Sequence, residues 1–341
     1  MGDRLTARIE EQIRLIERDL ASNDAGKRAD AIKRAESLTT EVLEYLAGAA
    51  ASYSGLASPV HGVALLWVDK LSTDLVLPPV GLVVPSAREF LGTLAQVIRL
   101  RVPDDGIWGL PVAVHEYGHF VATELRYRRI GDDDLPVAEA LVEDRLRELS
   151  PDNPLRFRLG HEIFADLFAT YVAGPSYLHY CIRHRFEPAR EPEPGHPQAR
   201  RRVAASLSML DAMATRPGGD SLVPIAEYLR TQWSEACSVV GLATEPAEDE
   251  LGIFVEELSG VVLNDAKLAN VAYKTHLPAR MLSERLRRNE AVYGPVAVVL
   301  NAAWSARVSA EASLSGVGLT NRLQAIESLA MQGLNRGAGR D

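Results

Sequence analysis

Two histidines and a glutamate stand together in the segment His115-Glu116-Tyr117-Gly118-His119, which fits the pattern H-E-x-x-H. Residues four positions apart on an α-helix lie one turn apart on the same face, so His115 and His119 can share one tetrahedral Zn²⁺ ion. Glu116 lies beside them, where it can hold and deprotonate a water on the metal. Chance alone gives about 0.025 matches to this pattern in a chain with eight histidines. The segment therefore predicts a catalytic zinc site on a helix.

A catalytic zinc ion usually has three protein ligands and one open position, so a third ligand is needed. The segment 161–169 reads HEIFADLFA and predicts a second helix. Glu162 and Asp166 share one face of it, and small alanines on or beside that face allow close approach to the first helix. We expect Glu162 to be the third ligand and Asp166 to accept the free ring N–H of a ligand histidine. His161 is the alternative third ligand, although about 100° per residue turns it in another direction.

An H-E-x-x-H helix followed by an E-x-x-A-D helix resembles the gluzincin metallopeptidases, and most closely the family of the CAAX-prenyl proteases and heat-shock membrane metalloproteases. That family has a His-Pro…Arg segment after the third-ligand helix, and here His196-Pro197 is followed by Arg202. The resemblance implies that His196 helps to bind substrate or the developing oxyanion, and that Arg202 braces the local carboxylates. It also implies a zincin-like helical core, a Zn²⁺ cofactor and a peptide or protein substrate.

The resemblance covers roughly residues 108–205, and two departures accompany it. Members of the prenyl-protease kind span membranes, whereas no stretch of about 18 apolar residues occurs here. The repressor-cleaving gluzincins of mobile elements carry E-x-x-A-N, whereas this chain has Asp166 at the last position. The aspartate favours the first family.

The overall composition is that of an ordinary globular chain. Of 341 residues, 47% are hydrophobic and 24% are charged, which excludes wholesale disorder and the fibrous classes. The two cysteines, Cys181 and Cys237, are too few for a disulfide framework or a four-cysteine zinc site, and we expect buried thiols. A net charge of −9 argues against sequence-independent nucleic-acid binding. The N-terminal segment lacks the apolar region of a secretory signal, so we expect a soluble cytoplasmic protein without nucleic-acid or membrane partners.

Helical spacing of apolar residues dominates the chain. It predicts an antiparallel hairpin over residues 4–48, two central helices at about 109–128 and 154–173, and several more helices over 200–335. The apolar stripes of the hairpin need a partner, either the rest of the chain or a second subunit, so the hairpin is a candidate for a homodimer contact. Residues 186–199 hold four prolines and predict an irregular loop.

A small sheet or ribbon is expected before the H-E-x-x-H helix. Short apolar runs bounded by turn residues over 63–84 predict strands, one of which can pair with an extended peptide substrate at its edge. Pro85 argues against a central strand. Residues 87–101 return to helical spacing, and 136–149 read as a short charged helix. The expected fold class is mainly α (α+β).

Three parts of the chain follow from these patterns: an N-terminal helical hairpin over 1–50, a zincin-like metallopeptidase core over 51–205 and a C-terminal helical region over 206–341. The expected function is that of a zinc-dependent peptidase with Glu116 as general base. Two alternatives stay open, a helical interaction protein with a structural or vestigial metal site and a latent protease specific for one partner protein. Further candidates for a hydrogen bond to a tetrahedral intermediate, or for core groups, are Tyr171, Tyr177, His179, Tyr180 and His184.

Overall fold

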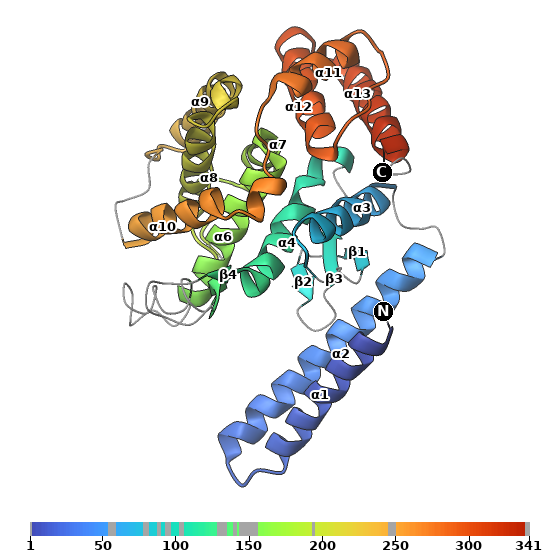
Figure 1. Cartoon of the computed structure of the whole chain (residues 1–341), viewed down its shortest axis with the longest axis vertical. Coiled ribbons are helices and arrows are strands. Elements are labelled where there is room, and N and C mark those ends of the chain that lie inside the picture. The colour runs from blue at the N-terminus through green and yellow to red at the C-terminus, as the bar shows by residue number, and fades with distance from the viewer. Residues whose placement is uncertain are drawn as a thin grey trace.

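The computed structural model of the chain is built mainly from helices (Figure 1). It describes residues 2–53, 59–77, 82–86, 90–92, 97–101, 106–127, 135–138, 142, 156–192, 195–244 and 250–337. Within these residues the expected mainly α fold is confirmed, and a small sheet precedes the helix that carries the H-E-x-x-H motif. None of the helices in the described part of the chain is long and apolar enough to cross a membrane.

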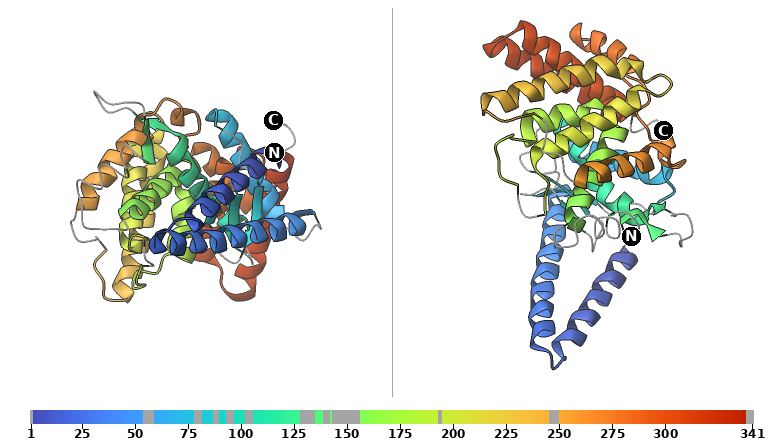
Figure 2. Two further views of the ribbon diagram at one scale, coloured as in Figure 1. Left: turned by 90° about the horizontal axis from the view of Figure 1, so that it is seen from below. Right: turned by 90° about the vertical axis from the view of Figure 1, so that its left-hand side faces the viewer.

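The N-terminal hairpin is confirmed. Helices α1 (Gly2–Leu20) and α2 (Ala25–Tyr53) pack against each other and project away from the rest of the chain, as Figures 1 and 2 show. The Asp24 carboxylate begins α2, because its Oδ1 accepts the backbone N–H of Gly26 at 2.8 Å. The hairpin buries part of its apolar surface between the two helices, whereas several large apolar side chains stay exposed: Ile13, Leu20, Ile32, Leu43 and Leu46.

Helix α3 (Pro59–Asp74) occupies most of the segment for which strands were expected, and that expectation is wrong over 63–68. The buried residues of α3 recur at helical spacing: Val60, Val63, Ala64, Trp67, Val68 and Leu71. A short apolar run in the middle of such a helix has no alternation that distinguishes it from a buried strand, which explains the error.

The three-stranded sheet consists of β1 (Leu82–Ser86), β2 (Phe90–Gly92) and β3 (Val97–Arg101) in the order β1-β3-β2. Strand β1 pairs parallel to β3, and β2 pairs antiparallel to it. Pro85 lies in β1 at an edge of the sheet, as a residue without a backbone donor requires. The helical spacing predicted over 87–101 is wrong, because β2 and β3 lie there and their pairing is not visible in local periodicity.

The two central helices are confirmed as α4 (Pro111–Glu124) and α6 (Arg156–Ala173), which pack against each other. A short 3₁₀ turn, η1 (Gly106–Gly109), leads into α4. Two antiparallel strands of two residues each, β4 (Arg126–Tyr127) and β5 (Leu135–Pro136), come after α4. The short helix predicted over 136–149 falls largely outside the described residues.

The remaining helices cover the other side of α6 and continue into a C-terminal bundle (Figure 1). Helix α8 packs on α6, and α12 packs on α7, α11 and α13. The bounds of the elements are α7 (Pro175–Tyr180), η3 (Cys181–Arg185), α8 (Ala199–Ala214), η4 (Gly219–Leu222), α9 (Val223–Val239), α10 (Glu250–Asn264), η5 (Leu268–Asn270), α11 (Leu277–Arg287), α12 (Val296–Ser313) and α13 (Gly316–Gly337).

Two further expectations concern the segment around α7 and α8. The described part of the proline-rich segment 186–199 has no helix or strand before Ala199, as expected for an irregular loop. Cys181 and Cys237 are both buried and free, as expected.

Gly174 separates α6 from α7 with a φ of +65°, a conformation that favours glycine and turns the chain sharply.

Candidate metal centre

The site is built where α4 and α6 approach most closely. A Cβ on Gly118 would lie only 3.0 Å from Cα of Ala165 and 3.3 Å from its Cβ. Glycine on one helix and alanine on the other therefore allow a separation that larger residues would prevent. This contact lies between His115 and His119 on α4 and faces the turn of α6 that carries Glu162, so it brings the three expected ligands together.

His115, His119 and Glu162 form a group that can hold a metal ion. Their ligand atoms all lie within 4.8 Å of one another. The Nε2 atoms of His115 and His119 are each 3.5 Å from a Glu162 carboxylate oxygen. A tetrahedral zinc ion with bonds of about 2.0–2.1 Å separates its ligand atoms by about 3.4 Å, so these spacings fit such an ion.

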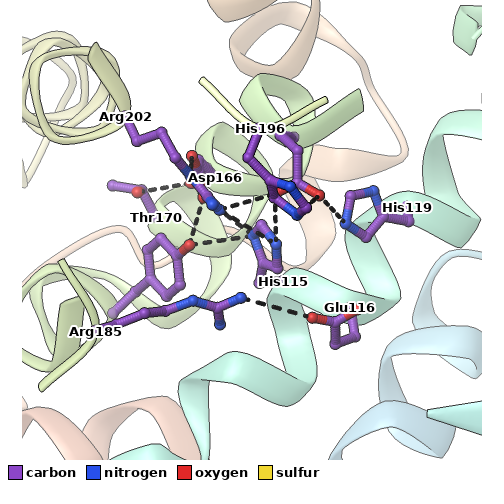
Figure 3. Close-up of polar contacts among 10 residues, drawn as sticks. His115, Glu116, His119, Asp166, Thr170, Arg185, His196 and Arg202 are labelled. Carbon is purple, nitrogen blue, oxygen red and sulfur yellow. Dashed lines mark hydrogen bonds and ion pairs between the residues drawn. The ribbon is translucent and has the colours of Figure 1, made fainter. Parts of the chain in front are cut away.

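Asp166 lies beside His115 (Figure 3) and faces its Nδ1 atom, whereas Glu162 faces its Nε2 atom. Its Oδ1 is 3.1 Å from Nδ1 of His115, and it also accepts a hydrogen bond from the Tyr177 hydroxyl. An N–H on Nδ1 leaves the lone pair of Nε2 directed to the Glu162 side, where a metal ligand needs it. The Tyr177 ring is stacked parallel to the His115 ring, with centroids 5.8 Å apart, and limits its rotation.

Arg202 on α8 links the two acidic residues. Its guanidinium donates to both Asp166 oxygens, at 2.7 and 2.8 Å, and its Nη2 lies 3.0 Å from Glu162 Oε2. Burial acts to raise the pKa of each carboxyl, but the Arg202 charge and the neighbouring histidines together outweigh it and hold both pKa values below their ordinary range. Glu162 and Asp166 therefore both stay ionised although they are buried. Glu162 needs its charge to act as a metal ligand, and Asp166 needs its charge to accept a hydrogen bond from an imidazole.

The two histidines differ in their electrostatic surroundings. Burial acts to lower the pKa of His115, but the carboxylates of Asp166 and Glu162 outweigh it and raise that pKa. Burial lowers the pKa of His119 to about 3, so this ring is neutral at pH 7 and free to act as a ligand.

His196 lies at the exposed side of the centre. Its Nε2 is 3.4 Å from Oε1 of Glu162, and 44% of its side chain is exposed. The structure thus places the histidine of the His-Pro…Arg segment beside the three potential ligands. His161, the alternative ligand, is not part of the His115/His119/Glu162 group, and its ring packs on Phe157 with centroids 4.4 Å apart.

Glu116 follows His115 on α4, and its side chain extends towards Arg185 (Figure 3). Its Oε1 is 3.9 Å from Arg185 Nη2, and only 5% of the glutamate side chain is exposed. Sequence reasoning did not single out Arg185, and Tyr177 was only one of several aromatic candidates. Neither position belongs to a local pattern with the ligands, so spacing alone offered no signal for them.

We compared the chain with protein-family models, curated proteins and solved structures. None of them matches. The interpretation of the site therefore rests on its own residues: three potential ligands within 4.8 Å of one another, a carboxylate next to one of them in space and a glutamate next to it in sequence.

Proposed function

We propose that this protein is a zinc-dependent peptidase whose metal is held by His115, His119 and Glu162. The observation that carries the proposal is the spacing of these three side chains, which meet from two helices within 4.8 Å. Two imidazoles and one carboxylate leave a fourth tetrahedral position for water or substrate, as in catalytic rather than structural zinc sites. A bound zinc ion would supply Lewis acidity and lower the pKa of a water molecule towards neutrality.

The side chains around the ligands have distinct roles in this proposal. Glu116 accepts a proton from the attacking water and later delivers it to the leaving amine, a role worth about 10²–10⁴-fold in rate. His196 donates a hydrogen bond to the substrate carbonyl oxygen as negative charge develops on it. Asp166 and Arg202 keep the His115 ring and the Glu162 carboxylate in place through the contacts described above.

The substrate in this proposal is a peptide in extended conformation. Strand β2 lies at an edge of the sheet and contacts α4, the helix that carries both histidines. An extended peptide can pair with such an edge through main-chain hydrogen bonds. This arrangement would carry the scissile bond along the face of α4, and it fits a protein that acts in the cytoplasm on unfolded segments or exposed loops.

Metal analysis combined with a hydrolysis assay tests the proposal. We expect purified wild-type protein and Glu116→Gln to hold about one zinc ion per chain. Only the wild type should cleave a library of unstructured peptides, with a loss of about 10²-fold or more in the variant. Glu227→Gln, an exposed substitution of the same type on α9, serves as the matched control. Equal hydrolysis by wild type and Glu116→Gln contradicts the proposed base, and wild-type protein without zinc contradicts the metal centre.

A structural metal site is the competing function, and the position of His196 favours considering it. The 3.4 Å between His196 Nε2 and Glu162 Oε1 would allow this histidine to complete a closed four-ligand shell. His196→Ala separates the two functions. A peptidase variant keeps its zinc and loses turnover, whereas a structural site loses zinc affinity. Zinc retention without cleavage of any generic peptide by the wild type would indicate a latent protease with one partner protein.

A further inference from the structure

The turn η3 brings Arg185 to the candidate centre from outside the sequence motifs. It follows α7 directly and is π-helical, and the backbone N–H of Phe186 donates to the carbonyl of Cys181 at 2.7 Å. A π-helical turn contains one more residue than an α-helical turn and is frequent at functional sites. Its last residue, Arg185, points to Glu116 on the neighbouring helix α4 (Figure 3).

Contacts on both sides fix this turn. On one side, Arg183 donates to Glu311 of α12 and, at 2.9 Å, to the Tyr228 hydroxyl of α9. Glu311 also accepts a hydrogen bond at 2.8 Å from Nε of Arg307. The C-terminal helices thus hold η3 through a bridging carboxylate whose side chain is about one-fifth exposed.

On the other side, the turn ends at the site itself. The ring of Phe186 lies under the guanidinium of Arg202, whose carbon is 4.8 Å from the ring centroid. Arg202 is the same residue that binds Asp166 and Glu162. The turn that carries Arg185 is therefore held between the contact of Arg183 to α12 and the contact of Phe186 to Arg202.

We propose that Arg185 is a positioning residue for Glu116, and that Glu311 on α12 positions Arg185 through Arg183. A cation 3.9 Å to one side of an almost fully buried carboxylate limits the rotamers that the carboxylate can adopt. Glu116 must be aimed at the attacking water to act as a base. This inference rests on the proposed peptidase function and gives the C-terminal helices a direct part in it.

The test uses full-length zinc-loaded protein and two kinds of measurement. The variants are Arg185→Gln, Arg185→Lys and Glu311→Gln, with Arg280→Gln on the exposed side of α11 as the matched control. The first measurements do not depend on turnover: they are the zinc content and the calorimetric affinity for acetohydroxamate. This small chelator has a hydroxyl proton that a general base accepts. Steady-state kinetics then separate kcat from KM.

We expect Arg185→Gln to keep its zinc, to bind acetohydroxamate about tenfold more weakly and to lose about 10–100-fold in kcat with little change in KM. Arg185→Lys should recover most of both losses, since it restores the charge, and Glu311→Gln should shift both in the same direction by less. Wild-type hydroxamate affinity in Arg185→Gln, or no recovery by Arg185→Lys, overturns the inference alone. Wild-type protein that holds no zinc, or that holds zinc but binds no hydroxamate, overturns the proposed function instead.

Discussion

The closest contact between α4 and α6 offers a sharp test of how the metal centre is assembled. Gly118→Ala adds one methyl group 3.0 Å from Cα of Ala165 and 3.2 Å from Cδ1 of Phe168. Because the first of these is a backbone atom, the two helices must separate by a few tenths of an ångström. Alanine gains about 1 kcal/mol over glycine in a helix interior, whereas overpacking costs about 1–3 kcal/mol. The expected net loss of stability is about 0–2 kcal/mol.

Gly62→Ala provides the matched control for this substitution. Gly62 lies in α3, and nothing lies within 4 Å of a Cβ placed there. The same chemical change should therefore stabilise the protein by about 1 kcal/mol. The two variants should differ by about 1–3 kcal/mol, the overpacking cost alone, in urea unfolding of the zinc-free proteins followed by circular dichroism.

The same displacement should reach the metal ligands, because His119 and Glu162 lie on the two helices that must separate. We expect Gly118→Ala to bind zinc about tenfold more weakly in a chelator competition titration, the lower range of what loss of an outer partner of a ligand costs. Gly62→Ala should bind zinc as the wild type does. Equal stabilisation by both substitutions, with unchanged zinc affinity in both, would refute the idea that this contact sets the ligand spacing.

Three other outcomes follow from the structure. Glu162→Ala should weaken zinc binding by more than about 100-fold in the same titration, and an unchanged affinity would exclude this residue as a ligand. Asp166→Asn removes the carboxylate that accepts two hydrogen bonds from the buried Arg202 and leaves only Glu162 opposite its charge, so it should cost about 3–5 kcal/mol in urea unfolding. A loss below about 1 kcal/mol would argue against the bidentate pair. Burial lowers the pKa of His179 to about 3, so the folded state keeps this ring neutral while the unfolded chain binds a proton below pH 6.5. The contribution of His179 to the free energy of unfolding is therefore fully present above pH 6.5, and it falls by about 1.4 kcal/mol per pH unit between pH 6.5 and 3. His179→Phe should make the free energy of unfolding fall less between pH 7 and 5. An equal fall in the wild type and the variant would contradict the lowered pKa of this ring.

The sequence predicted those parts of the site whose geometry follows from spacing along a single helix. His115 and His119 are one helical turn apart by spacing alone, and so are Glu162 and Asp166. The choice of Glu162 over His161 followed from the direction of side chains on one helix, and the structure places Glu162 and not His161 in the ligand group. The small residues that allow the two helices to approach were also visible.

The parts that sequence reasoning missed depend on long-range pairing. Strand β3 pairs with β1 across some fifteen positions of chain, and its segment read as helical because parallel pairing leaves no local period. The bond from Arg183 to Glu311 joins residues 128 positions apart. Arg185 lies two residues further along the same turn and 3.9 Å from Glu116, 69 positions away in the chain, so its place beside Glu116 could not be read from spacing.

Arg202 gives the metal centre one further property. It stands between Asp166 and Glu162, so two anions meet one cation inside the protein and only a single negative charge is left when the imidazoles are neutral. In small zinc domains the ligands repel or scatter until the ion arrives, and the chain unfolds when a chelator takes it away. In the proposed site, the positive charge of Arg202 would take over most of the ion's part in holding the acidic residues together. If the proposed ion binds, it could be exchanged or supplied late while the architecture around the site persists, and metal loading would then be a step that can be regulated separately from folding.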